Sequence, residues 1–172
     1  MILINDSVGG MKAQDSTLGS PGMVRELWLL KQEISELAPN NSTFLSENGF
    51  HLRSFILGED DGIWLSLNAQ SFKDHPEQGG WGLSDLNHRV NEEWFDEKGF
   101  FIAERDNQMI GFTWTKIHGA HSHDHGGNES AHAHPAIGEI YITGISPSFA
   151  GAGIGKALTI TALNYLKYQG LA

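Results

Sequence analysis

Residues 137–170 read IGEIYITGISPSFAGAGIGKALTITALNYLKYQG, and this stretch decides the expected fold. Apolar and other side chains alternate over residues 137–145, which predicts a strand. Residues 146–153 contain proline and glycine and predict a loop. An apolar residue recurs at every fourth position of residues 154–168, which predicts a helix, and Gly170 is a suitable C-cap. The stretch therefore predicts a strand, a glycine-bearing loop and a helix.

The glycines of residues 151–155 lie between the expected strand and the expected helix. Glycine lets the backbone approach a ligand, and a helix N-terminus presents free N–H groups, so such a loop can hold a phosphate. It is not a P-loop, because Ala150 stands where that motif needs glycine and Ala157 where it needs Ser or Thr. It is not a dinucleotide fingerprint, because Lys156 replaces the third glycine. From the residues alone, a phosphate loop and a turn without a ligand both stay open.

The residues before this stretch predict the remaining elements of one domain. Residues 50–57 alternate in the manner of a strand, and an apolar stripe after Asp61 predicts a helix. A second helix is expected from Ser84 onward. Residues 99–116 predict two antiparallel strands joined tightly at Asp106-Asn107. The order of elements is therefore strand, two helices, hairpin, strand, loop and helix.

Residues 117–136 hold six of the nine histidines, among glycine, alanine, aspartate and serine. They show no hydrophobic period, which predicts a solvated loop. Neutral imidazole is a good ligand for Zn²⁺ or Ni²⁺, so a metal-binding module is the alternative. Because the spacing is irregular and no cysteine assists, we expect no metal here.

Composition excludes several classes of function. The 172 residues carry a formal net charge of -10, which argues against a protein that tracks nucleic-acid phosphates. The absence of cysteine excludes a disulfide scaffold, a thiolate nucleophile and cysteine-ligated metal sites. No stretch approaches the roughly 18 apolar residues of a membrane span, so we expect no membrane partner and a cytoplasmic protein.

The sequence also predicts how the chain is divided. Residues 1–22 are expected to form a flexible tail, and residues 38–49 are rich in turn formers and predict a linker. Residues 23–37 have apolar residues at helical spacing, with a short strand as the alternative. Residues 50–172 form the main domain, and it is expected to be truncated at its C-terminus because no strand follows the last helix. The missing strand would leave an exposed edge through which the chain could self-associate.

Ile145-Ser146-Pro147 and residues 150–155 match the frame of the acetyl-CoA loop of the GNAT N-acetyltransferase family, which reads V-x-P and then Q/R-x-x-G-x-G/A. The flanking blocks resemble the C-terminal half of the mycothiol synthases, a branch of that family. The resemblance implies the α/β GNAT fold, with a mixed, mostly antiparallel sheet flanked by helices. It also implies that residues 23–37 are a remnant of a preceding acetyltransferase half and contain its closing strand. The similar blocks are His75–Trp81, Glu93–Asp96, Gly111–Lys116 and Gly138–Ile142.

The same resemblance implies acetyl transfer from acetyl-CoA to a primary amine, the cysteinyl amine of Cys-GlcN-inositol in mycothiol biosynthesis. Another small amine, or a truncated fragment without activity, is the alternative. A carboxylate on the strand before the cofactor loop can accept the amine proton, so Glu139 is the expected general base. The implied acetyl-CoA contacts are Thr143, Gly144, Ile145, Ala150, Gly151, Ala152, Gly153, Ile154, Gly155 and Lys156, and the implied substrate contacts are Glu77, Lys116 and Glu139.

Two departures from the family pattern bear on these expectations. Ala150 and Ala152 stand where the family usually has Gln, Arg and other basic residues, which removes charge-assisted phosphate contacts but keeps the backbone donors. The family's general acid is a Tyr beyond the last helix, outside these 172 residues. We therefore expect weakened CoA affinity.

Overall fold

The computed structural model describes residues 2–6, 28–32, 42–119, 121–123, 132–134 and 136–171. The side chains of the four strands within residues 2–6, 28–32, 121–123 and 132–134, and those of Ser42, Pro76 and Glu77, lie outside this description.

A six-stranded sheet forms the centre of the fold, with the strand order β2-β1-β8-β5-β4-β3. Neighbouring strands are antiparallel except for β1 and β8, which are parallel. The mixed, mostly antiparallel sheet expected from the sequence is therefore confirmed. The strands are β1 (Ile2–Asp6), β2 (Trp28–Gln32), β3 (His51–Ser54), β4 (Phe100–Arg105), β5 (Gln108–His118) and β8 (Ile137–Ile145).

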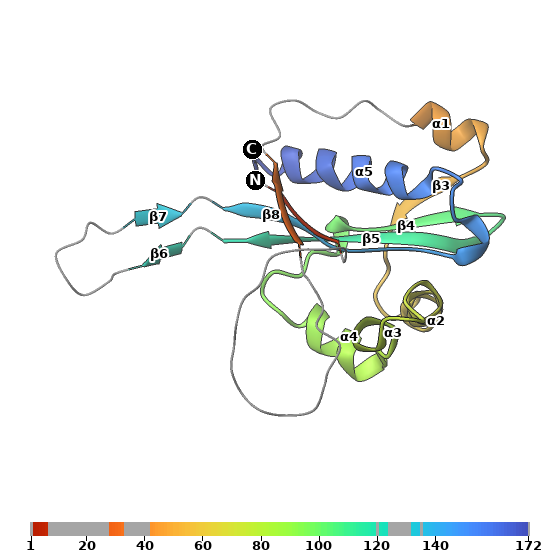
Figure 1. Ribbon diagram of the computed structural model, residues 1–172, viewed down its shortest axis with the longest axis horizontal. Coiled ribbons are helices and arrows are strands. Elements are labelled where there is room, and N and C mark those ends of the chain that lie inside the picture. The colour runs from red at the N-terminus through yellow and green to blue at the C-terminus, as the bar shows by residue number, and fades with distance from the viewer. Residues whose placement is uncertain are drawn as a thin grey trace.

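Helices cover both faces of the sheet (Figure 1). The long helix α5 (Ile154–Tyr168) and the short helix α1 (Ser42–Glu47) lie on one side. The helices α2 (Asp61–Ser71), α3 (Pro76–Gly79) and α4 (Leu83–Val90) lie on the other. Among the described residues, no helix is both long and apolar enough to cross a membrane.

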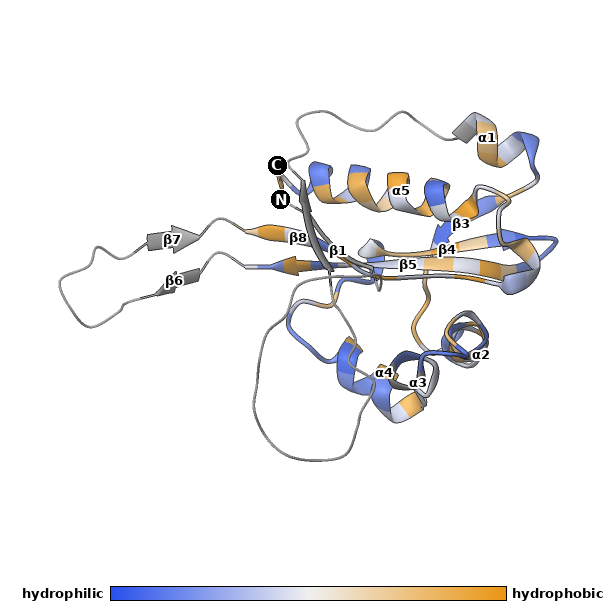
Figure 2. Ribbon diagram, viewed as in Figure 1, coloured by the Kyte–Doolittle hydropathy of each residue, from blue (hydrophilic) through white to orange (hydrophobic). Residues whose placement is uncertain are grey.

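Aromatic side chains fill the core between the sheet and α2. Trp64, Phe100 and Trp114 are fully buried there. The rings of Phe100 and Trp114 are stacked with centroids 4.5 Å apart, and Trp64 meets both edge-on. On the other face, Leu158 and Leu166 of α5 are buried against the sheet, and apolar residues mark the inner side of this helix in Figure 2. Because side chains are closely packed on both faces of the sheet, β5 and β8 form a rigid support for a site.

Several elements agree with the sequence to the residue. The strand over residues 137–145 and the helix over residues 154–168 have the expected bounds. Asp106 and Asn107 join β4 and β5 with positive φ angles of 51° and 60°, as a tight hairpin of this kind requires. Gly170 follows α5 with a φ of 81°, which is the left-handed conformation expected just past a helix end.

The N-terminal third differs from what its composition predicts. Residues 2–6 fall in the expected tail, yet they form β1, which pairs with β8 over Gly138–Ile140. The helix expected over residues 23–37 is wrong at Trp28–Gln32, which form a strand, as the family resemblance implies. The expected linker contains α1, whose Leu45 is buried against α5. Strand pairing at the first two places, and packing against α5 at the third, override the local pattern.

Pairing with β1 also changes the expected free edge. The sequence predicts an exposed edge where a strand after the last helix is missing. In the structure, β1 pairs with β8 over residues 138–140, and β2 is the outermost strand on that side of the sheet. Self-association through a strand edge stays a prediction.

The expected histidine-rich loop contains two strands. β6 (His121–His123) and β7 (His132–His134) pair antiparallel and project beyond the body of the molecule (Figure 1). The register that pairs His118 with Ile137 at the end of β5 also pairs His121 with His134. The loop prediction is therefore wrong for these six residues, which pair as a separate two-stranded sheet.

Candidate active site

The glycine loop joins β8 to α5 and begins with the helical turn η2 (Pro147–Phe149). Gly151 and Gly153 have φ angles of 79° and 82°, in the left-handed region that favours glycine. The first bond within α5 runs from the N–H of Ala157 to the carbonyl of Gly153. Residues 154–156 therefore present N–H groups without an acceptor in the helix, at the positive end of its dipole. Such an arrangement can hold a phosphate.

The two left-handed glycines have different surroundings. A Cβ atom at Gly153 would lie 2.8 Å from Cζ of Phe44, so α1 closes this side of the loop. At Gly151, no described atom outside the neighbouring residues lies within 4 Å of the same position. The loop is therefore supported on the side of Phe44 and open around Gly151.

Among the described residues, no strand pairs with one edge of β8 beside this loop. β1 pairs with β8 only over Gly138–Ile140, whereas β5 pairs along the whole strand. The N–H of Ser146 donates to the carbonyl of Ile110, and hydrogen-bonded positions alternate in an antiparallel ladder. The backbone groups of Thr143 and Ile145 therefore point away from β5, toward the edge that β1 leaves unpaired. They can bond to an extended ligand lying along β8.

A β-bulge separates residues that simple alternation places together. Alternation predicts Glu139, Tyr141 and Thr143 on one face of the strand, but the pairing with β5 shifts by one position at Tyr141. Glu139 pairs with Lys116, and Thr143 pairs with Thr113. Lys116 and Thr113 are three residues apart and lie on opposite faces of β5. The prediction is therefore wrong for Thr143, which lies on the face away from Glu139.

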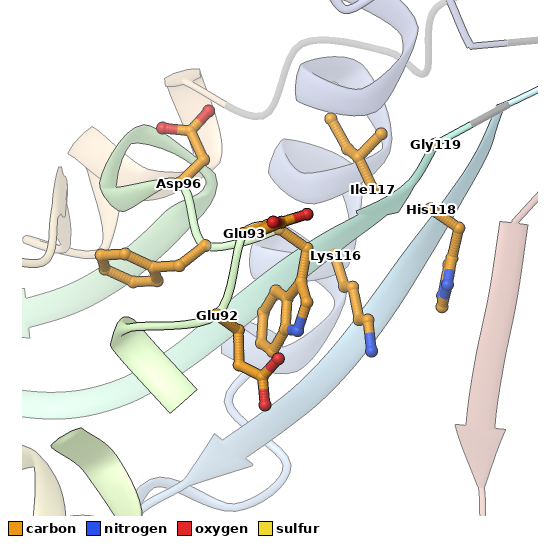
Figure 3. Close-up of a pocket in the computed structure, with 9 residues that line it drawn as sticks. Glu92, Glu93, Asp96, Lys116, Ile117, His118 and Gly119 are labelled. Carbon is orange, nitrogen blue, oxygen red and sulfur yellow. The ribbon is translucent and has the colours of Figure 1, made fainter. Parts of the chain in front are cut away.

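Lys116, His118 and Glu139 form a polar cluster on the face covered by α4. Nε2 of His118 lies 2.7 Å from Oε2 of Glu139. Nζ of Lys116 lies 4.7 Å from the ring centroid of Trp94. Lys116 and His118 point to the same side of β5 and Ile117 to the other (Figure 3). An adjoining cavity of about 630 Å³ is lined by Glu92, Glu93, Trp94, Phe95, Asp96, Lys116, Ile117, His118 and Gly119.

The cavity has an acidic wall that suits a cationic ligand. Glu92, Glu93 and Asp96 line it, and Glu139 lies beside it through its pairing with Lys116. The Lys116 ammonium also lies 5.8 Å from the ring centroid of Tyr141, so two aromatic rings hold this cation. Burial raises the pKa of the Tyr141 phenol above its ordinary value, and the negative charges of Glu139 and Glu92 add to this effect against that of Arg89. The Tyr141 side chain is therefore uncharged and borders the cluster beside the Lys116 ammonium.

Comparison with known proteins identifies the family. Residues 64–172 match the Acetyltransferase (GNAT) family. The chain belongs to the GNAT acetyltransferase family. Within this family, the chain is 42% identical over 163 residues to the mycothiol acetyltransferase of Acidothermus cellulolyticus, covering 95% of this chain and 50% of that protein. It is 45% identical over 148 residues to the mycothiol acetyltransferase of Frankia alni, covering 86% of this chain and 43% of that protein.

The GNAT chain thus spans about half the length of the curated relatives it matches. Among solved structures, a GNAT family acetyltransferase from Brucella melitensis in complex with acetyl-CoA is 19% identical and aligns with a TM-score of 0.47, over 71% of each chain. The ribosomal-protein-S18-alanine N-acetyltransferase of Escherichia coli is 15% identical, with a TM-score of 0.47, over 72% of this chain and 63% of that chain.

The fold brings together some of the residues implied by the GNAT resemblance. Lys116 on β5 pairs with Glu139 on β8, so two of the three implied substrate contacts lie side by side. Glu77 lies in α3, and its side chain is outside the described part of the chain. The implied cofactor positions fall in two places. The backbone groups of Thr143 and Ile145 point outward from the unpaired edge of β8, and the remaining positions from Ala150 to Lys156 form the loop and the start of α5. Gly144 has its backbone groups directed at β5 instead.

His118 is the site residue that sequence reasoning missed. The composition of residues 117–136 predicts a loop that includes His118, whereas β5 continues to this residue without interruption. Side chains two residues apart on a strand lie on the same face of the sheet, so extending the strand past Lys116 places His118 on the face of Lys116. The available signal was therefore the strand period, which a run of histidines and glycines hid.

Proposed function

We propose that this chain binds acetyl-CoA and transfers its acetyl group to a small primary amine, the cysteinyl amine of Cys-GlcN-inositol. The observation that carries the proposal is the arrangement along β8: an anion-binding helix N-terminus follows one end, and a carboxylate–imidazole pair lies near the other. The similarity to two mycothiol acetyltransferases supports this choice of amine.

The described residues fit an elongated cofactor with phosphates at one end. Ile145 lies six positions after Glu139, which corresponds to about 20 Å of extended strand. The outward N–H and C=O groups of Thr143 and Ile145 lie between these ends and suit the amide groups of a pantetheine arm. Residues 150–156 would hold the pyrophosphate through backbone N–H groups. Gly151 leaves open space where a side chain would otherwise stand.

Bound acetyl-CoA supplies an acetyl group activated as a thioester, and the residues of this chain prepare the amine. An amine attacks only when it is neutral, so its proton must be removed. Glu139 accepts this proton, directly or through water. A carboxylate can only accept hydrogen bonds, so Nε2 of His118 donates to Glu139 and holds it in place. The outward N–H of Thr143 or Ile145 can donate to the acyl oxygen.

The acceptor side suits a cationic amine attached to a polar body. Carboxylates of Glu92 and Glu93 line the cavity and attract an incoming ammonium group. Lys116 is positioned by Trp94 to donate hydrogen bonds to hydroxyl or carbonyl oxygens of the same substrate. This combination favours a hydrophilic acceptor over a peptide with large apolar side chains.

Cofactor binding is tested by thermal unfolding of the 172-residue chain with and without acetyl-CoA. Selective binding to the folded chain raises the midpoint, and a free concentration 100-fold above Kd adds about 2.7 kcal/mol of stability. The expected result is a clear rise with acetyl-CoA and none with an equal concentration of acetate. An unchanged midpoint would contradict the proposed cofactor site.

Catalysis is tested by release of free CoA thiol in the presence of Cys-GlcN-inositol. Glu139→Gln keeps a side chain of the same shape but removes the base, and we expect kcat to fall by about 10² to 10⁴. The acetyl-CoA-dependent rise in the midpoint should persist in this variant. Glu59→Gln is the matched control, because Glu59 is exposed in the turn before α2. Equal activity of Glu139→Gln and Glu59→Gln would exclude Glu139 as the base.

A further inference from the structure

A shallow groove lies beside the glycine loop, between the outer face of α2 and the turn η2. Its volume is about 530 Å³. The α2 side supplies residues at the helical spacing i, i+3, i+4 and i+7, which form one stripe facing the start of the loop. The lining residues are Ser66, Ala69, Gln70 and Lys73 on the α2 side and Pro147 and Ser148 on the η2 side.

Contacts at the end of α2 hold this groove next to the loop. Oγ of Ser71, the last residue of α2, donates to the carbonyl of Ile145 at 3.0 Å. A Cβ atom at Gly144 would lie 3.2 Å from Cβ of Ser71, so the end of the helix and β8 are in close contact. Lys73 lies in the turn that follows Ser71, and Ser148 lies in η2. The two sides of the groove are therefore fixed to each other through β8.

The polar side chains of the groove are hydrogen-bond donors. Lys73 has an ammonium group, and Ser66, Gln70 and Ser148 have hydroxyl or amide donors. Among the described residues that line the groove, none carries a carboxylate. Lys73 is exposed and forms no ion pair with another described residue. This combination suits an anion that has several acceptor oxygens.

Acetyl-CoA carries such an anion close to its pyrophosphate. Both groups are attached to one ribose, the pyrophosphate at the 5′ oxygen and a phosphate monoester at the 3′ oxygen. A phosphate monoester has a charge of about −1.5 to −2 at pH 7 and three strong acceptor oxygens. Ala150 and Ala152 leave the glycine loop with backbone donors only. A cation beside the loop would therefore add the charge-assisted contact that the loop lacks.

We propose that Lys73, together with Ser148, binds the 3′-phosphate of acetyl-CoA in this groove. The inference rests on the proposed function, because it requires the pyrophosphate to occupy the glycine loop. Lys73 then supplies, from the end of α2, the positive charge that Ala150 and Ala152 do not provide. It also makes the chain selective for CoA over a cofactor without the 3′-phosphate.

A purely structural role of Lys73 has a different consequence. A cation just beyond the C-terminus of a helix stabilises that helix through its dipole. In that case, Lys73→Gln would lower the stability of the chain and weaken the binding of both cofactors alike. A contact with the 3′-phosphate weakens the binding only of the cofactor that carries this group.

The test compares acetyl-CoA with acetyl-dephospho-CoA, which lacks the 3′-phosphate, by isothermal titration of the 172-residue chain. We expect the unchanged chain to bind acetyl-CoA about 3- to 10-fold more tightly, between the effect of an exposed ion pair and that of a hydrogen bond to a charged group. In Lys73→Gln the two dissociation constants should become nearly equal, through weaker binding of acetyl-CoA.

Lys98→Gln is the matched control, because it removes the same charge at an exposed position outside the groove and the loop. Lys98 lies in the helical turn η1 (Glu97–Gly99). This variant should keep the preference of the unchanged chain for acetyl-CoA. Thermal unfolding of both variants without cofactor verifies that they remain folded.

The outcomes separate this inference from the proposed function. If neither cofactor binds to the unchanged chain, the proposed function fails and the role of Lys73 fails with it. If both cofactors bind equally well, the proposed function stands, but the 3′-phosphate makes no contact in the groove. A preference that Lys73→Gln retains in full would place the 3′-phosphate elsewhere. A preference lost equally in Lys73→Gln and Lys98→Gln would assign it to net charge, and each of these last three results overturns the inference.

Discussion

Nε2 of His118 lies 2.7 Å from Oε2 of Glu139, so the last residue of β5 contacts the side chain of the expected general base on β8. The side chain of Glu139 is 15% exposed and that of His118 is 33% exposed. The imidazole thus shields the carboxylate from part of the solvent and restricts its rotamer. Both effects matter for a group that has to receive a proton from a substrate at one position.

Replacing His118 is expected to lower turnover without removing cofactor binding. His118→Ala takes away the N–H that orients Glu139, and we expect kcat to fall about 10- to 100-fold, as is typical when a group that orients a functional residue is lost. His118→Gln retains a donor and should recover part of this loss. Steady-state kinetics with varied amine measure kcat and KM separately. A change confined to KM would contradict a positioning role and favour direct substrate contact.

The glycine loop should respond differently to alanine at its two left-handed positions. Gly151→Ala meets open space and suffers only from its backbone conformation, at a cost of about 1–2 kcal/mol. Gly153→Ala suffers the same strain and also brings its Cβ to 2.8 Å from the Phe44 ring. Urea unfolding should therefore rank Gly153→Ala as the less stable variant. In a Phe44→Leu background, the difference between the two alanine variants should shrink, and an unchanged difference would exclude the Phe44 contact as its cause.

Close packing of β8 on β5 predicts a large effect at Gly144. A Cβ atom there would lie 2.5 Å from two carbons of the Phe112 ring, which is fully buried and has little room to move. We expect Gly144→Ala to lower the free energy of unfolding by about 1–3 kcal/mol. Gly62→Ala is the control, because no described atom lies within 4 Å of its Cβ position in α2. That substitution should raise stability by about 0.4–1 kcal/mol, since alanine favours a helix.

Protonation of the Asp60 carboxylate should lower the stability of the protein in acid. Its carboxylate binds the Arg53 guanidinium at 2.6 and 2.8 Å and accepts the N–H of Ile56, and these contacts hold the pKa of Asp60 below its ordinary value. A depressed pKa stabilises the folded chain above the unfolded-state pKa of about 3.9, and this stability disappears as the pH falls through the lower folded-state value.

Asp60→Asn should therefore lower stability at pH 7 by about 1–3 kcal/mol and flatten the pH dependence of unfolding below about pH 4. Chemical denaturation at a series of pH values measures both. Asp106→Asn is the control, because Asp106 is 92% exposed and lies 3.7 Å from Arg105 in a surface pair. If Asp60→Asn and Asp106→Asn gave the same pH profile of unfolding, the contact with Arg53 would contribute nothing measurable to stability.

The sequence determined the parts of the fold that follow from local periodicity. The strand Ile137–Ile145 and the helix Ile154–Tyr168 were predicted to the residue, since alternation and a 3.6-residue period are properties of neighbouring side chains. The glycine loop between them was likewise visible, because positions that need positive φ select glycine. The motif around this loop also sufficed to indicate the GNAT family, which the match over residues 64–172 confirms.

The tertiary structure decided what depends on distant residues. Ile2–Asp6 joins β8 although more than 130 residues separate them, and no local pattern encodes such a pairing. The bulge at Tyr141 arises only where β5 and β8 meet, and it moves Thr143 to the face opposite Glu139. His118 reaches Glu139 because the two strands are in register. A sequence lists its side chains in order, but the pairing of strands sets which of them share a face and a site.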